Sequence, residues 1–339
     1  MKFNILFRVD AGEKIGLGHL RRCLALAEGF RTRGVKRIGF LTRTRPDISP
    51  WIKRRFSILE LKARSFSEEA RELEVLLALL NPKMLIVDHY GVDSKFLERV
   101  RSLVPALLYM DDEARMRHYP VDGIINHNVY AKKLKYRALP DTRLFLGPRY
   151  TLIGSEFFKA RRKAVIASPA GAKQSRRSLR RSAPRDDVRL KLFVSLGGYV
   201  PKASFGKIKK ALQISNGRLK VFWAGGRKPV GKEMASSDLA LSASGVTSYE
   251  LAYLGVPALL TTVAKNQEGI AEELARRGTA ENLGRLKRLT PRGIIRRINA
   301  LIQSPKKLQG MRRKAKALID GRGAFRLAED LMKTYWSAE

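Results

Sequence analysis

The stretch FNILFRVDAGEKIGLGHLRRCLALAEGFRTRG, residues 3–34, decides the fold. It opens with a short apolar run, Phe3 to Val9, that is typical of a buried strand. From Leu20 onwards apolar residues recur at helical spacing, and Gly34 suits the end of that helix. A glycine-rich loop joins the two. A strand, a tight loop and a helix in this order are how an open α/β sheet begins.

The same alternation of strand and helix continues along the chain. Short apolar runs predict further strands at Arg37–Thr42, Met84–Val87, Ala106–Met110 and Gly123–Ile125. Later runs predict strands at Lys191–Ser195, Leu219–Trp223, Leu239–Ser242 and Ala258–Thr262, with helices at Ala203–Ile214, Ser248–Leu254, Gln267–Arg277 and Pro291–Ile302. We therefore expect an α/β protein with parallel sheets and helical crossovers.

The 339 residues are enough for two domains of ordinary size. Residues 1–160 form the expected N-terminal domain and residues 191–339 the C-terminal one. Between them, residues 161–190 hold ten Lys and Arg against two Asp, which predicts a basic, Ser- and Arg-rich linker. The closing segment, Gln309 to Trp336, has a helical rhythm, and we expect the last helix to pack back on the first domain.

Composition limits the partners. Lys and Arg number 68 against 31 Asp and Glu, a formal charge of +37, so the chain attracts polyanions: nucleotides, nucleic acids or anionic surfaces. One cysteine and four histidines exclude an intramolecular disulfide and disfavour a metal centre, so we expect no metal and no cofactor. No apolar stretch is long enough to cross a bilayer, and the single cysteine is compatible with a cytoplasmic protein.

The first loop carries the strongest candidate site, because open α/β sheets bind ligands where strands end. Glycines allow a sharp turn and close ligand approach, and amides at a helix start favour negative charge. Histidine exchanges protons near neutral pH, which makes His19 a candidate general base. On spacing alone, His19 could equally cap the helix. The candidates in this region are Arg8, Asp10, Gly16, Gly18, His19 and Arg22.

Further polar residues follow other predicted strands of the first domain. Asp88 and Tyr90 end one strand, with His89 between them, and Asp111 and Asp112 end another. One of these groups orients His19 or holds a sugar hydroxyl or amide. The competing interpretation is that the aspartates cap turns, as they often do at strand ends.

The second half has two small-residue loops that follow strands and suit a diphosphate cradle of backbone amides. The competing interpretation is tight turns with a surface carboxylate. Neither loop has the spacing of a P-loop, which weakens an ATPase hypothesis. Amides also follow the Ala258 strand. The candidates here are Gly197, Gly198, Ser244, Gly245, Thr247, Ser248, Glu250, Asn266 and Gln267.

Several motifs in one order resemble the PseG family of UDP-sugar hydrolases of pseudaminic acid biosynthesis. The related SpsG proteins carry similar motifs, and the C-terminal half is similar to the nucleotide-sugar domain of MurG-type glycosyltransferases. The similarity runs from Lys2 to about Gly284. The matching motifs are Arg8-Val-Asp10, Ile15-Gly-Leu-Gly-His19, Arg22-Cys-Leu-Ala-Leu-Ala27, Val87-Asp-His-Tyr90, Gly147-Pro-Arg-Tyr150, Ser195-Leu-Gly-Gly198, Thr247-Ser-Tyr-Glu-Leu-Ala-Tyr-Leu-Gly-Val-Pro257 and Asn266-Gln267.

The resemblance implies a GT-B-like fold, two Rossmann-type domains facing across a cleft, with UDP bound chiefly by the C-terminal domain. It implies hydrolysis of a UDP-linked 2,4-diacetamido-2,4,6-trideoxy-hexose by water attack at the anomeric carbon. His19 then matches the general base, Glu250 the glutamate that holds the ribose, and Asn266 an asparagine of the substrate site. Tyr150 falls within a matching motif and is a further candidate substrate contact.

The chain departs from the family pattern at three places. Gly154 stands where we expect an arginine, Ser244-Gly245 stands where we expect two glycines, and only about a dozen residues separate Trp223-Ala-Gly-Gly226 from the strand that starts at Leu239. The family has room there for a further strand and helix of the nucleobase pocket. We therefore expect a C-terminal domain shortened around residues 227–238 and a remodelled uracil site.

Three functions follow from these observations. The first is a UDP-sugar hydrolase, and the second is a glycosyltransferase of the SpsG or MurG type on the same fold. The third is a basic protein with impaired catalysis that binds nucleic acid or anionic surfaces, although no nucleic-acid-binding motif supports it. We expect a UDP-sugar as the small-molecule partner and no specific nucleic acid. A peripheral contact with an anionic surface and the oligomeric state stay open.

Overall fold

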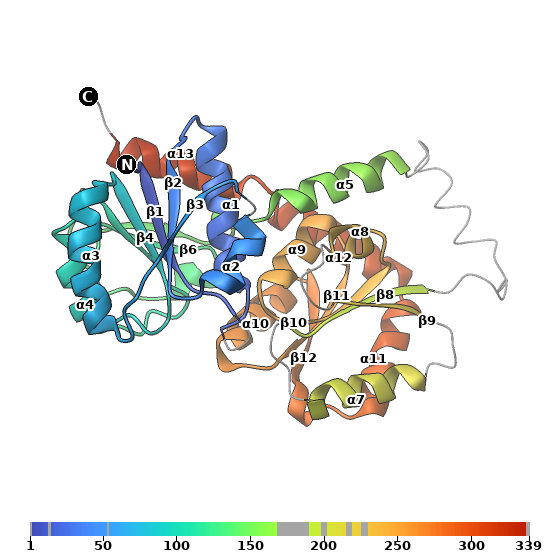
Figure 1. Ribbon diagram of the computed structural model, residues 1–339. Helices are drawn as coiled ribbons and strands as arrows, with labels where there is room; N and C mark the ends of the chain where they lie inside the picture. Colours follow the sequence, from blue (N-terminus) through green and yellow to red (C-terminus); the bar gives the residue numbers. More distant parts are fainter. Residues whose placement is uncertain are drawn as a thin grey trace. The chain divides into compact units, whose positions relative to one another are not determined.

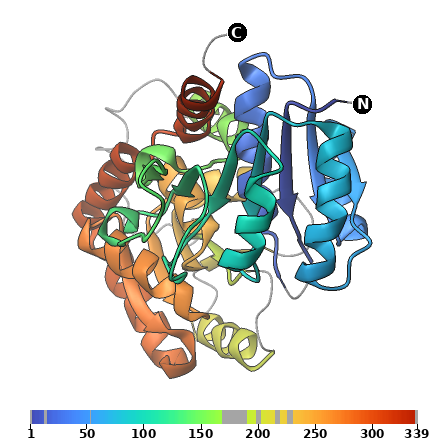
Figure 2. The same cartoon turned by 90° about the vertical axis from the view of Figure 1, so that its left-hand side faces the viewer.

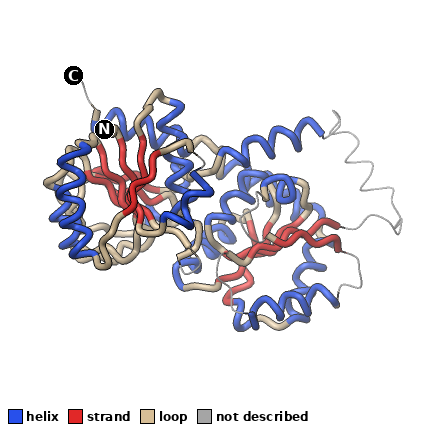
Figure 3. The backbone as a smooth tube through the Cα atoms, viewed as in Figure 1, coloured by secondary structure: helices blue, strands red, loops and turns tan. Residues whose placement is uncertain are grey.

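The computed structural model describes residues 2–12, 15–52, 54–167, 190–197, 202–214, 219–224 and 230–336. It divides into two compact units, each with its own parallel sheet: Met1–Gly154 with Gly321–Glu339, and Ser155–Asp320 (Figure 1, Figure 3). The expected boundary at residue 160 falls inside helix α5 (Ser155–Ala167), which belongs to the second unit. Residues 168–189, most of the expected linker, lie outside the described residues.

The first unit holds a seven-stranded sheet in the order β3-β2-β1-β4-β5-β6-β7, and every neighbouring pair is parallel. The central strands are apolar and fully buried because helices cover both faces. The strands are β1 (Ile5–Val9), β2 (Ile38–Thr42), β3 (Ser57–Glu60), β4 (Met84–Asp88), β5 (Leu107–Met110), β6 (Gly123–Asn126) and β7 (Arg143–Leu146).

Two separate apolar layers sandwich this sheet. Helix α1 (Gly18–Thr32), with α2 (Arg45–Ile52), packs on one face together with the last helix, α13 (Gly323–Tyr335). Helices α3 (Phe66–Leu80) and α4 (Ser94–Arg101) cover the other face, where Figure 2 shows them side by side. The 3₁₀ turns η1 (Ala131–Lys133) and η2 (Pro148–Tyr150) flank β7. The starts of α3 and α4 are fixed by Ser65 and Asp93, whose side chains accept from backbone amides.

The second unit holds a five-stranded parallel sheet in the order β12-β11-β10-β8-β9. Helices α7 and α11 supply much of the apolar layer on one face, and α9 packs against α5, α8 and α12. The elements are β8 (Leu190–Ser195), α7 (Lys202–Gln213), β9 (Leu219–Trp223), α8 (Gly231–Ala235), β10 (Leu239–Ala243), α9 (Val246–Leu254), β11 (Ala258–Thr262), η3 (Lys265–Gln267), α10 (Glu268–Arg276), β12 (Ala280–Arg285), η4 (Leu286–Arg288), α11 (Pro291–Ile302) and α12 (Pro305–Leu318).

The closing segment differs from the sequence-based expectation of one helical rhythm over Gln309–Trp336. The helix breaks after Leu318 and a new one begins at Gly323, with Gly321 between them at a φ of +83°, the left-handed region that favours glycine. The break separates the two halves: α12 stays in the second unit, whereas α13 packs on α1 in the first. In the region expected to be shortened the structure has the one short helix α8, and residues 225–229 lie outside the described residues.

No helix among the described residues is long and apolar enough to cross a bilayer.

Helices α1 and α13 approach closely at Gly29, and this contact yields a test. A Cβ atom on Gly29 would lie 2.6 Å from the backbone oxygen of Ala324. We predict that Gly29→Ala lowers the free energy of unfolding by roughly 1–3 kcal/mol, because α13 must shift to relieve the overlap. Alanine otherwise favours a helix interior by about 1 kcal/mol, so the effect opposes helix propensity. Urea unfolding measures it.

Gly310→Ala in α12 is the matched control, because a Cβ atom there meets nothing within 4 Å. It should leave stability unchanged or raise it slightly. A Gly29→Ala protein as stable as the Gly310→Ala protein would contradict the packing of α13 on α1.

Candidate active site

Polar residues of the first unit gather at one edge of its sheet. Val9 on β1 pairs with Asp88 at the end of β4, and Val87 pairs with Tyr109 on β5. Met110, the last residue of β5, pairs with Ile125 on β6. Because the strands are parallel and in this register, the residues that follow each strand meet at the same edge.

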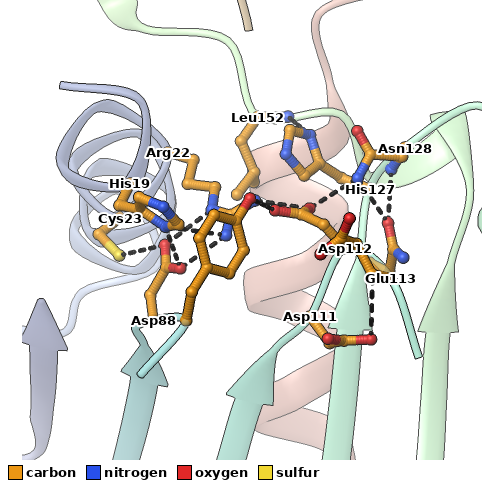
Figure 4. Close-up of polar contacts among 12 residues, drawn as sticks. His19, Arg22, Cys23, Asp88, Asp111, Asp112, Glu113, His127, Asn128 and Leu152 are labelled. Atoms are coloured by element: carbon orange, nitrogen blue, oxygen red, sulfur yellow. Dashed lines mark hydrogen bonds and ion pairs between the residues drawn. The ribbon is translucent and has the colours of Figure 1, made fainter. Parts of the chain in front are cut away.

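The first loop brings the start of α1 to this edge. Gly12 and Gly16 exchange backbone hydrogen bonds, with Gly16 N donating to Gly12 O over 2.6 Å, and Gly16 has a φ of +81°. Gly12 and Gly16 are therefore held together just before α1 begins at Gly18. His19 and Arg22 lie near the start of α1, one turn apart, and point toward the end of β4 (Figure 4).

His19 and Asp88 form a buried dyad. His19 Nδ1 lies 2.6 Å from Asp88 Oδ1, and the two side chains are 10% and 0% exposed. Arg22 Nη2 lies 3.1 Å from the same imidazole nitrogen. If Nδ1 were the bare nitrogen, its lone pair would face a carboxylate oxygen at 2.6 Å, which is repulsive. Nδ1–H therefore donates to Asp88, and in the neutral form of the ring the lone pair is on Nε2.

Arg22 joins this dyad to a second carboxylate. Its Nε and Nη2 donate to the two oxygens of Asp88 over 2.7 and 2.6 Å, and its Nη1 donates to both oxygens of Asp112 over 2.8 and 2.9 Å. Tyr90 Oη and Asn128 Nδ2 also donate to Asp112, over 2.5 and 2.6 Å. Figure 4 shows the line His19, Asp88, Arg22 and Asp112 running across the strand ends.

The electrostatics of this line keep both carboxylates ionised. Burial raises the pKa of Asp88, but the charge of Arg22 and the contact with His19 outweigh it and hold that pKa far below its usual range. For Asp112, burial is likewise outweighed by Arg22, and its pKa falls to about 2. Burial and the Asp88 carboxylate raise the pKa of the Cys23 thiol, which donates to Asp88 Oδ2 over 3.4 Å. Cys23 is therefore a protonated neighbour of the dyad.

Arg8 and Asp10 belong to an adjacent buried cluster. Arg8 donates to both oxygens of Glu69 on α3, over 2.5 and 2.7 Å, and to Asp10 over 2.9 Å. Asp10 also accepts from Thr42 Oγ1 and from the amide of Arg43. The Nη1 atom of Arg8 is buried and has no hydrogen-bond partner. The charges of this cluster are thus largely paired inside the protein.

Several residues of this edge were not predicted from the sequence. Asn126 ends β6, and His127 and Asn128 directly follow it, so the same strand-end signal that singled out Asp88 could have found them. Glu69 lies inside α3, where no local sequence signal distinguishes a buried ion-pair partner from a surface glutamate.

Tyr90 and Tyr150 lie in different surroundings. The Tyr90 ring meets His19 edge-on, with 4.5 Å between ring centroids, and the residue is 48% exposed. Tyr150 instead donates its hydroxyl to Asp330 on α13, over 2.8 Å. A substrate contact for Tyr150 stays a prediction.

The small-residue loops of the second unit also share one sheet edge. Ser195 on β8 pairs with Ser242 on β10, and Ala243 pairs with Thr261 on β11. Gly197, with a φ of +88°, therefore follows β8 beside the loop that starts α9. Gly198 lies outside the described residues.

Helix α9 starts without a side-chain cap. Gly245 is its N-cap residue, in an extended conformation, and a Cβ atom there would meet nothing within 4 Å. Thr247, on the first turn, is half-buried. The hydroxyl groups of Ser244 and Ser248 turn inward to Thr261 O and Ala243 O. The start of α9 is therefore lined by backbone rather than by side chains.

The remaining candidates of the second unit surround this start. Glu250, one turn into α9, is 2% exposed. Asn266 and Gln267 are half-buried on η3 after β11. Gln267 Oε1 accepts from the amide of Val263 over 2.9 Å, so this side chain holds its own loop.

Across the ranges that the structure describes, no three His, Cys, Asp or Glu side chains are grouped as metal ligands.

The fold is that of the GT-B glycosyltransferases, an α/β class with two parallel sheets and interleaved helices. The crystal structure of MurG from Acinetobacter baumannii matches with a TM-score of 0.64 at 13% identity, over 97% of this chain and 99% of that chain. The predicted fold class is confirmed.

Curated relatives confirm the predicted resemblance to PseG- and SpsG-like proteins. The UDP-2,4-diacetamido-2,4,6-trideoxy-beta-L-altropyranose hydrolase of Campylobacter jejuni is 32% identical over 159 residues, 46% of this chain and 53% of the hydrolase. The spore coat polysaccharide biosynthesis protein SpsG of Bacillus subtilis is 22% identical over 96% of this chain and 97% of that protein. A third match, to an uncharacterized protein of Methanocaldococcus jannaschii, is 25% identical and spans 34% of that protein's length. No family model matches.

His127 gives the edge a testable dependence on pH. Burial and the charge of Arg22 lower its pKa from 6.5 to about 4. Between these values the unfolded chain binds a proton that the folded protein rejects, so stability is full above pH 6.5 and falls as the pH drops toward 4. We predict that this residue alone removes about 3 kcal/mol of the free energy of unfolding across that window.

Urea unfolding of wild type and His127→Gln at pH 7 and pH 4.5 measures the contribution. The variant should lose less stability than wild type between the two pH values. Equal losses would show that His127 is not held neutral in the folded state.

Proposed function

We propose that the protein is a hydrolase that removes UDP from a UDP-linked 2,4-diacetamido-2,4,6-trideoxy-hexose. The observation that carries the proposal is the His19–Asp88 dyad, whose geometry leaves a bare Nε2 on the neutral histidine at the start of α1. The resemblance to PseG and the hydrolase activity for which the C. jejuni relative is named support the substrate class.

In the proposed reaction His19 Nε2 takes a proton from water while the water oxygen attacks the anomeric carbon. The bond between that carbon and the phosphate oxygen breaks, its electron pair leaves with UDP, and the free sugar keeps the hydroxyl. Asp88 accepts Nδ1–H throughout and stabilises the imidazolium that forms. Arg22 holds Asp88 in place by two hydrogen bonds.

We assign the nucleotide to the second unit. The uncapped start of α9 offers backbone amides to a diphosphate, and donors arranged in advance stabilise the charge of the leaving group. Glu250 would accept from ribose hydroxyls, and Asn266 would contact the substrate. The lining is mostly backbone, and Gly197 and Gly245 leave room for a pyrophosphate to approach it closely.

Transfer to a sugar acceptor is the second candidate, because the match to SpsG covers nearly the whole of both chains. The chemistry differs only in the nucleophile, a hydroxyl of an acceptor in place of water.

The first test is the release of UDP from the UDP-linked diacetamido sugar in ¹⁸O-labelled water. We expect free sugar that carries one ¹⁸O, and a rate reduced roughly 10²- to 10⁴-fold in His19→Ala, since a general base contributes about that much. His118→Ala is the matched control and should retain the wild-type rate. Mass spectrometry of the sugar and a coupled UDP assay give both readouts.

If the sugar were found joined to an acceptor and carried no ¹⁸O, the protein would be a transferase and not a hydrolase. Equal rates in His19→Ala and wild type would remove His19 from the mechanism.

The second test is protection of the fold by UDP. Ligand that binds the folded state raises stability by about 2.7 kcal/mol at a concentration one hundred times Kd. We predict that UDP raises the Tm of wild type, and that Glu250→Gln weakens UDP binding about tenfold through loss of an ionic acceptor. Glu272→Gln, an exposed carboxylate on α10, is the control. Unchanged affinity in Glu250→Gln would place the ribose elsewhere.

A further inference from the structure

Asp112 is hydrogen-bonded as fully as Asp88, yet it does not touch His19. It follows β5, is 6% exposed, and accepts from Arg22, Tyr90 and Asn128. Asn128 is itself held, since its Nδ2 also donates to Asn126 Oδ1 over 2.9 Å. Each oxygen of Asp112 therefore accepts from two donors, which leaves the carboxylate one orientation.

The guanidinium of Arg22 transmits this orientation. It is planar, so fixing Nη1 by two bonds to Asp112 also fixes the plane in which Nε and Nη2 meet Asp88. Asp88 Oδ1 accepts from both Arg22 Nη2 and His19 Nδ1, each over 2.6 Å. A rotation of the guanidinium would pull Asp88 away from the imidazole or bring Arg22 Nη2 closer to Nδ1.

The charges of the His19 line also favour the hydrogen bond from His19 to Asp88. One guanidinium faces two carboxylates, so with neutral His19 the line carries one net negative charge. Without Asp112, Asp88 alone would balance Arg22, and its attraction for the imidazole N–H would weaken. The second carboxylate thus keeps Asp88 available as the acceptor for His19.

We propose that Asp112 is a positioning residue for His19: through Arg22 and Asp88 it selects the tautomer that carries its lone pair on Nε2. Its effect on turnover rests on the proposed function, whereas its effect on the tautomer does not. Neighbouring Asp111 makes a contrasting set of contacts. Its Oδ2 accepts from the amides of Glu113 and Ala114 in the turn after β5, so it is a structural carboxylate on the same strand end.

The test compares Asp112→Asn with Asp111→Asn. Long-range ¹H–¹⁵N correlation spectra of the four imidazoles report the tautomer of each histidine, and His19→Ala assigns the His19 signals. We expect one tautomer, with bare Nε2, in wild type and in Asp111→Asn, and a mixture in Asp112→Asn. With the UDP-sugar, Asp112→Asn should lower kcat about ten- to a hundredfold and change KM less than twofold, the size typical of supporting partners. Asp112→Glu, which keeps the charge, should recover part of kcat.

Two further variants test whether Asp112 acts through His19. In His19→Ala, addition of Asp112→Asn should have no further effect on the residual rate if Asp112 acts through His19. If Asp112→Asn fails to fold, Asn128→Ala replaces it, since it loosens Asp112 without removing its charge. It should also mix the tautomers.

A single unchanged tautomer in folded Asp112→Asn, or in folded Asn128→Ala where that variant replaces it, would overturn the proposal. A mixture that appears equally in Asp111→Asn would do the same, because a general loosening of the strand end would then explain it. A tautomer mixture confined to folded Asp112→Asn, in a protein whose wild type releases no UDP, would overturn the proposed function and support the positioning role of Asp112.

Discussion

The carboxylate of Asp88 is the contact on which the site in the first unit depends. It accepts from Arg22 and His19 on α1 and from Cys23, while its own backbone belongs to β4. An unpaired buried carboxylate costs several kcal/mol, so Asp88 is tolerated only with these donors in place. The donors in turn require the first loop to return α1 to the edge of the sheet. Chemistry and fold are therefore coupled through one side chain.

The same coupling explains why the dyad belongs to α1 and not to another helix. α1 follows β1, which is the neighbour of β4 in the sheet, and Val9 pairs directly with Asp88. The start of a helix that follows β1 is therefore within reach of the end of β4. The pairing of Gly12 with Gly16 keeps the start of α1 close to the end of β1.

The sequence predicted the central strands and missed three at the sheet margins: β3, β7 and β12. Buried parallel strands are continuous apolar runs. These edge strands are partly exposed, so polar and apolar residues are mixed in their sequences, as in Arg143–Leu146. At the site, strand ends could be predicted because polar residues there follow apolar runs, which singled out Asp88 and Asp112. Glu69, the partner of Arg8, could not, since it lies inside α3 and reaches this edge only through tertiary packing. The break at Gly321 was missed because helical periodicity continues on both sides of it.

The large positive charge of the chain and the chemistry of the site have separate origins. At the site, Arg8 is matched by Glu69 and Asp10, and Arg22 by Asp88 and Asp112, so the buried arginines add no net positive charge there. Helix α12, by contrast, has six exposed Lys and Arg and no acidic residue. The surplus thus lies on surfaces such as this one, where it attracts polyanions in general and is screened by salt. In the proposed function, specific recognition comes from short-range geometry instead: the backbone at the start of α9, and a histidine held by its carboxylate neighbour.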